Sequence, residues 1–142
     1  MASTQTEHAQ IGSKAAAISN MVVRTVSEYT GRGPTKARTY ITDDVVTVIL
    51  QDTLTKGERS LVAEGLHEHV LATRKAFQNT MRHSLVSGVE EILGRRVTAF
   101  FSDNNIEPDM AAETFVLAPQ GAEPQSDGSL ASAGPAGEPS GG

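Results

Sequence analysis

The segment GRGPTKAR, residues 31–38, combines two glycines with three cationic side chains. Gly31 and Gly33 leave backbone amides unshielded, so these amides can point at an anion, and neighbouring cations can add charge-assisted hydrogen bonds. If the following residues form a strand, Lys36, Arg38 and Tyr40 point to one side of it. We therefore predict a site for a small anion, such as phosphate or bicarbonate, or for an anionic nucleotide. Its residues would be Gly31, Arg32, Gly33, Lys36, Arg38 and Tyr40.

The same segment also has a purely structural interpretation. Glycine accepts the left-handed conformation that closes a helix, and Pro34 forbids continuation of the helix, so the segment can simply join a helix to a strand. It does not match the phosphate loop GxxxxGK[ST], and the dinucleotide fingerprint opens a helix rather than ending one. Turn chemistry explains the glycines and the proline, but it does not explain three cations in seven residues.

Other residues that could do chemistry are sparse. Glu64 and His67 form a Glu-x-x-His pair of the kind found in di-iron bundles, but such a centre needs a second pair and two more carboxylates. His69 is two residues from His67 and points to a different side of a helix. The chain has no cysteine, and no nucleophile stands beside a recognisable base. We expect no metal, no cofactor and no catalysis, with an uncharacterised enzyme as the alternative.

The first half of the chain predicts a helix followed by a hairpin. Apolar side chains recur every three or four residues from Ile11 to Tyr29, which is typical of a helix with one apolar face. The β-branched and aromatic runs 36–41 and 45–50 then flank a turn rich in aspartate, which predicts two antiparallel strands.

The second half repeats this order. A capping box, Thr55 to Glu58, begins a helix whose apolar spacing continues to about Leu93. Residues 95–102 and 111–118 predict another hairpin. The order α-β-β-α-β-β predicts an α+β fold, in which a four-stranded antiparallel sheet carries a short and a long helix.

The long predicted helix suggests self-association. An unbroken helix over residues 56–93 would be about 57 Å long, whereas a domain of this size has a radius of gyration of only ~13 Å. A helix that overhangs its domain favours a partner, so we predict a homodimer with Phe77, Met81 and Leu85 in its interface. Gly65 and Gly88 are the positions where the helix could instead bend or break.

The ends of the chain differ from its middle. We predict a flexible segment over residues 1–10, a single domain over residues 11–118, and a disordered tail rich in Pro, Gly and Ser over residues 119–142. The whole chain of 142 residues has a net charge of -5, but residues 11–118 hold all 12 Lys and Arg against 13 of the 17 acids. This near-neutral domain predicts no nucleic-acid partner. No apolar run approaches the ~18 residues of a membrane span, so we expect a soluble cytoplasmic protein without direct membrane insertion.

Three motifs resemble a known family. YTGRGPTKAR, LTKGER and GRRVTAFFSDNN-x-x-PD occur in this order and cover most of the predicted domain. Together they resemble the small bacterial MpsC-like proteins, named for a membrane-potential-generating system. The resemblance implies a link to a membrane cation-translocating and inorganic-carbon-uptake system, without an established chemical role. We therefore expect an accessory or regulatory protein that pairs with itself and is peripheral to the membrane through a transport complex.

Overall fold

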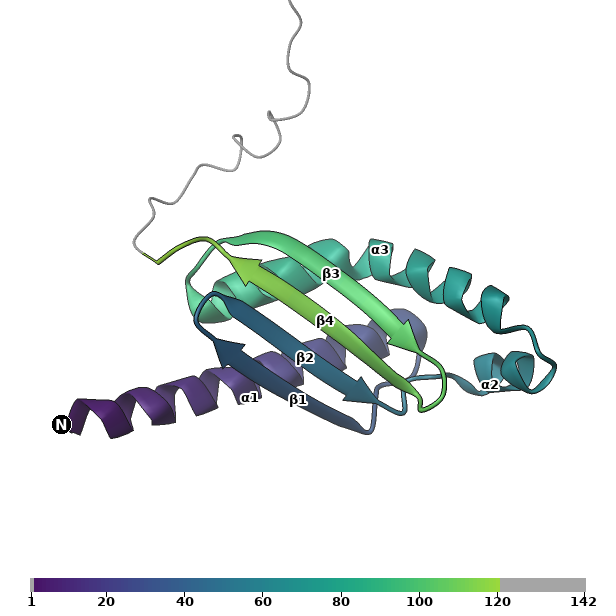
Figure 1. Ribbon diagram of the computed structural model, residues 1–142, viewed down its shortest axis with the longest axis horizontal. Coiled ribbons are helices and arrows are strands. Elements are labelled where there is room, and N and C mark those ends of the chain that lie inside the picture. Colours follow the sequence, from purple (N-terminus) through teal and green to yellow (C-terminus); the bar gives the residue numbers. More distant parts are fainter. Residues whose placement is uncertain (1, 121–142) are drawn as a thin grey trace, which may run out of the picture.

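The computed structural model describes residues 2–120, with side chains from Gln5 onward. Three helices and four strands follow one another along the chain (Figure 1). They are α1 (Ala2–Thr30), β1 (Lys36–Thr42), β2 (Val45–Gln51), α2 (Lys56–Ala63), α3 (His67–Leu93), β3 (Val97–Asn105) and β4 (Met110–Leu117). The predicted α+β fold with one antiparallel sheet is confirmed. The predicted tail lies almost wholly outside the described residues.

Two hairpins build the sheet. The strands pair in the order β1-β2-β4-β3, all antiparallel, so β1 and β3 are the outer strands. Both long helices lie on the same side of the sheet (Figure 1). Helix α1 packs over β1, α3 packs over β3, and the two helices contact each other.

The core lies between this helix pair and one face of the sheet. Alternate residues of β2 and β4 point into it, as the period of two in a strand requires. The helices contribute residues spaced three or four apart. The apolar face predicted from Ile11 to Tyr29 is buried from Ile18 to Val26, whereas Ile11 and Tyr29 at its two ends are exposed. Fully buried core side chains include Ile18, Val22, Val46, Val48, Leu85, Val89 and Phe115.

Helix α1 is longer than predicted. It begins at Ala2, within the segment that was expected to be flexible. This segment contains no proline and no glycine before Gly12, so nothing in it breaks a helix. Side chains from Gln5 to Lys14 are exposed, and this end of α1 projects past the sheet (Figure 1).

The predicted helix over residues 56–93 is two helices, so the 57 Å rod is wrong. The break lies at Gly65, whose φ of 81° is left-handed and closes α2. The amide of Leu66 then donates to the carbonyl of Leu61 at 2.9 Å, which ends the first helix before α3 begins. The predicted capping box of α2 is confirmed, because Thr55 Oγ1 accepts from the Glu58 amide at 3.1 Å and Glu58 Oε1 accepts from the Thr55 amide at 2.8 Å.

Gly88, the other position where a break was considered, lies inside α3. A Cβ atom there would stand 2.6 Å from Met21 Sδ, so the glycine lets α1 approach α3 closely.

We predict that Gly65→Ala destabilises the fold. The left-handed conformation costs a residue with a Cβ atom roughly 1–2 kcal/mol, and the lower entropy of the unfolded alanine chain offsets only part of that cost. Thermal unfolding should show a Tm about 4 °C lower. Gly57→Ala is the matched control, because Gly57 lies in α2 with φ outside the left-handed region and open space around its Cβ position. An equal Tm for both variants would contradict the prediction.

Candidate functional site

The joint between α1 and β1 contains the first part of the predicted anion segment. Gly31 has a φ of 82° and its amide donates to the carbonyl of Ser27 at 2.9 Å, so it ends α1 as the structural interpretation requires. A Cβ atom at Gly33 would lie 3.4 Å from Val23 and Ser27 side-chain atoms, because the chain folds back against α1 here. Both glycines therefore have a structural role.

The cations of this segment lie in two places. Arg32 points to Asp52, with 2.8 Å between Arg32 Nη2 and Asp52 Oδ2, and it also donates to the Asp52 carbonyl at 3.2 Å. Lys36, Arg38 and Tyr40 alternate along β1 and are exposed on the face of the sheet that carries no helix. The prediction that these three share one side is correct for the strand, but Arg32 is not beside them.

Arg32 instead lines a surface hollow between the end of α1 and the start of α2. The hollow has a volume of about 460 Å³, and Arg32, Lys56 and Arg59 bring three cations to it. Arg59 shares Asp52 with Arg32, because Arg59 Nη2 lies 2.5 Å from Asp52 Oδ1. Part of the positive charge is therefore neutralised within the protein.

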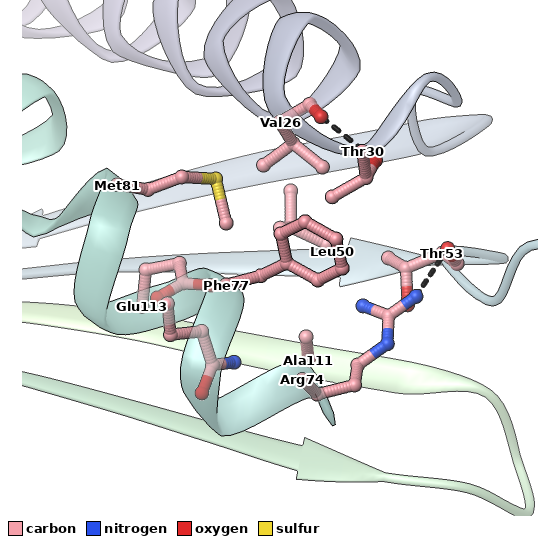
Figure 2. Close-up of a pocket in the computed structure, with 10 residues that line it drawn as sticks. Val26, Thr30, Leu50, Thr53, Arg74, Phe77, Met81, Ala111 and Glu113 are labelled. Carbon is pink, nitrogen blue, oxygen red and sulfur yellow. Dashed lines mark hydrogen bonds between the residues drawn. The ribbon is translucent and has the colours of Figure 1, made fainter. Parts of the chain in front are cut away.

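A buried polar cluster holds α2, α3 and the strand ends together. Arg74 Nη2 donates to Glu58 Oε1 at 2.8 Å, and the side chains of both residues are only about a tenth exposed. Arg74 Nη2 also donates to the carbonyl of Thr53 (Figure 2). Asp109, in the turn between β3 and β4, accepts from the Thr53 amide, the Thr53 hydroxyl and the Leu54 amide, each at 3.0 Å. These bonds fix the segment between β2 and α2 from two sides.

Glu113 is the most unusual member of this region. It lies on β4 with its side chain 2 % exposed, facing the helices, and its Oε1 atom has no hydrogen-bond partner among the described residues. Burial raises its pKa from 4.5 to about 7, against the smaller lowering effects of the Ser102 hydroxyl and the Arg74 guanidinium. A buried carboxyl group of this kind is therefore largely neutral below pH 7.

A small cavity adjoins Glu113, Arg74 and Gln78 beneath the end of α1 (Figure 2). The space in which the centre of a water molecule can lie is about 10 Å³. That is close to the room that one water needs. The cavity can hydrate the carboxyl group of Glu113, but it is too small for an organic substrate.

This cluster was missed in the sequence, although a signal for it exists. Alternation along β4 places Glu113 on the same face as Ala111, Phe115 and Leu117, so a charged residue interrupts an otherwise apolar strand face. Arg74 likewise lies on the inward side of α3, among buried residues at three-to-four spacing. An acid and a base that interrupt two apolar faces predict a buried ion pair or hydrogen-bond network.

The residues predicted for a dimer interface lie largely inside the protomer. Met81 and Leu85 are 3 % and 0 % exposed in the core, and Phe77 is half-buried against it. They pack against α1 and the sheet of their own protomer. The homodimer stays a prediction, but Met81 and Leu85 have no free surface in this fold.

Glu64 and His67, the pair considered as metal ligands, have no further ligands beside them. The described residues contain no group of three or more His, Cys, Asp or Glu that could hold a metal.

Comparison with known protein families identifies the family of this chain. A family model described as Na+-translocating membrane potential-generating system (MpsC) matches residues 10–119. The chain belongs to this family. The match runs from α1 through β4, so the sheet, the helix pair and the buried cluster are all parts of the MpsC region. The resemblance predicted from the three motifs is thereby confirmed.

Other comparisons add no relative. No curated protein matches the chain, and no solved structure matches it. Within residues 2–120, no helix of this MpsC protein combines the length and the apolar character that crossing a membrane requires.

We predict that Glu113 makes the fold less stable as the pH rises. Its folded-state pKa of about 7 lies above the usual 4.5, so between these values the folded state binds more protons than the unfolded state and the free energy of unfolding falls with pH. The full effect is about 3 kcal/mol. Urea denaturation at pH 5 and pH 8 should show most of this loss in the wild type and much less of it in Glu113→Gln. Glu68→Gln, at an exposed position of α3, should behave like the wild type. If Glu113→Gln loses as much unfolding free energy between pH 5 and pH 8 as the wild type does, Glu113 is not the group responsible.

We also predict that Arg74→Met strongly destabilises the protein. Removing one member of a buried ion pair leaves the other charge uncompensated, at a cost of about 3–5 kcal/mol. Arg59→Met removes an exposed ion pair with Asp52 and should cost less than about 1 kcal/mol. Denaturation at pH 7 compares the two, and Glu58→Gln in the Arg74→Met background should recover part of the loss. Equal costs for Arg74 and Arg59 would show that burial of the Arg74 pair is unimportant.

Proposed function

We propose that this MpsC-family protein is a non-catalytic accessory or regulatory component of the membrane potential-generating system. It acts as a homodimer in the cytoplasm, and it reaches the membrane through a protein partner. The observation that carries the proposal is the face of the sheet that carries no helix, which we call the bare face and which includes Arg38 and Tyr40 of β1. Tyr40, Val45 and Phe101 are 51 %, 40 % and 60 % exposed on it, and aromatic residues are enriched where proteins bind one another.

The interior supports a binding role rather than catalysis. Arg74, Glu58 and Asp109 are engaged in structural contacts, since Arg74 bonds Glu58 and Thr53 while Asp109 bonds Thr53 and Leu54. The cavity beside Glu113 has room for about one water molecule. A substrate would have to displace the contacts that hold α2 and α3 in place.

Site-specific photocrosslinking in growing cells tests this proposal. A photoreactive residue at Phe101 should give crosslinks to a second copy of the chain or to a membrane subunit of the system, identified by mass spectrometry. The same residue at Glu68, exposed on α3 on the helix side of the sheet, should give neither. Equal crosslinking from both positions, or none from position 101, would contradict a role for the bare face.

A second candidate function is small-anion or nucleotide binding. The observation that favours it is the hollow where Arg32, Lys56 and Arg59 meet the start of α2, since cations and helix amides together attract phosphate-like groups. This arrangement keeps Gly31 and Arg32 of the predicted segment and replaces Lys36 and Arg38.

A thermal-shift assay with phosphate and with bicarbonate, at matched ionic strength, distinguishes the two sets of cations. A bound anion raises Tm by mass action, and Lys56→Ala should abolish this rise, whereas Arg38→Ala should leave it unchanged. A rise lost in Arg38→Ala instead would favour the site predicted from the sequence. No rise in the wild type would exclude both sites.

A further inference from the structure

The bare face of the sheet carries four rows of side chains. Residues directly paired across antiparallel strands point to the same face, so the strand register fixes which side chains stand in one row. A hydrogen bond of 3.2 Å between the hydroxyls of Thr47 and Thr114 agrees with this assignment. The two central rows, read from β1 through β2 and β4 to β3, are Arg38, Ile49, Ala112, Asp103 and Tyr40, Thr47, Thr114, Phe101.

The two ends of each row complement each other. In one row a cation, Arg38, stands on outer strand β1 and an anion, Asp103, stands on outer strand β3. In the next row an aromatic residue stands at either end, Tyr40 on β1 and Phe101 on β3. Between these ends the rows carry only small, aliphatic or hydroxyl side chains. Neither Arg38 nor Asp103 takes part in the ion pairs formed within the described residues.

This pattern is self-complementary under one rotation. A twofold axis that lies between two stacked sheets and runs parallel to the strands places β1 of one copy over β3 of the other. It also leaves every row facing itself, so Arg38 faces Asp103 of the second copy and Tyr40 faces Phe101 of the second copy. Each of these contacts occurs twice, as a twofold interface requires.

We propose that two copies of this chain stack their bare sheet faces about such an axis, joined by two Arg38–Asp103 ion pairs and two Tyr40–Phe101 aromatic contacts. This inference rests on the homodimer of the proposed function and names its interface. It replaces the α3 interface that the sequence suggested. Aligned sheets rotate by about 30° against each other, an offset that the long side chains of Arg38 and Tyr40 can span.

A hollow on the same face suits the arginine. It has a volume of about 210 Å³ and is lined by Ile49, Ala112 and Asp103, together with residues near the turn between β3 and β4. The hollow forms where the small side chain of Ala112 stands between the larger ones. The methylene groups of Arg38 from the second copy can lie over Ala112 while its guanidinium reaches Asp103.

Charge also disfavours the other twofold arrangements. An axis across the strands stacks β1 on β1 and β3 on β3. If that axis passes through the charged row, Arg38 faces Arg38 and Asp103 faces Asp103. If it passes between the two central rows, Asp103 faces Phe101 and its charge is left against an aromatic ring. Opposed like charges and unpaired charges both weaken association.

The area of the face predicts a weak dimer. Four strands spaced about 4.8 Å apart span ~19 Å, and strands of about seven residues span ~23 Å, which gives roughly 440 Å² in each copy before side-chain relief is added. A total near 900 Å² belongs to the small end of specific interfaces. We therefore expect a dissociation constant in the micromolar range, about 1–100 μM.

Sedimentation equilibrium of the full chain, at concentrations that bracket this range, tests the interface by charge reversal. Arg38→Glu and Asp103→Arg should each raise the dissociation constant about tenfold or more, because each turns two attractive pairs into repulsive ones. The double variant restores opposite charges and should return to within about threefold of the wild type. Arg24→Glu, at an exposed position of α1 on the other side of the sheet, is the matched control, and circular dichroism checks that every variant folds.

The outcomes separate the two proposals. A wild type that stays monomeric at the highest concentration overturns the homodimer and this interface together. A wild-type dimer that both single variants leave intact overturns the interface alone. Weakening by both single variants without recovery in the double variant overturns the twofold arrangement. If the protein is a monomer and crosslinks from position 101 to a membrane subunit, the bare face binds another protein, and this inference is overturned.

Discussion

One face of a four-stranded sheet is buried under two helices, and the rest of the molecule depends on that contact. Helices α1 and α3 cover β1 and β3 on the same side of the sheet and contact each other (Figure 1). The close approach at Gly88 and Met21 lets the two helices share one layer. Because both helices use the same side, the opposite face of the sheet keeps β-branched and aromatic residues in solvent, although half-covered sheets usually present polar residues there. The exposed face is thus a direct consequence of how the core is built.

The buried ion pair explains how the short helix α2 is held. Eight residues are too few for a stable isolated helix, so α2 depends on its capping box and on the contact between Glu58 and Arg74. The Glu58 carboxylate serves both, since Oε1 accepts from the Thr55 amide and from the Arg74 guanidinium. Asp109 adds the turn between β3 and β4 to the same network. Replacing a buried ion pair by apolar residues is often neutral for stability, so the main consequence of this network is the fixed position of α2 against α3 and the strand ends.

The candidate sites illustrate how a chain segment can be divided by its fold. The cations of residues 31–38 are close in sequence, but the strand sends Lys36 and Arg38 to the bare face while Arg32 turns to Asp52. Each group then acquires a different set of neighbours. Arg38 joins a row that ends in Asp103, and Arg32 joins Lys56 and Arg59 at the start of α2. Composition signalled a concentration of charge, and the path of the backbone distributed that charge between the start of α2 and the outer strand β1.

Local patterns in the sequence determined the family, the α+β class, the two hairpins, the apolar face of α1 and the capping box of α2, because each depends on residues within a few positions of one another. Only the tertiary structure decided the rest. Gly65 was recognised as a possible break, but choosing between a bend, a break and a continuous helix depends on whether α3 can pack across the sheet once the chain turns. Met81 and Leu85 were recognised as one apolar face, but sequence spacing does not say whether α1, the sheet or a second copy covers that face. The burial of Glu113 beside Arg74 and the row that joins Arg38 to Asp103 both bring together residues far apart in the chain, and strand order and register, which are non-local, place them there.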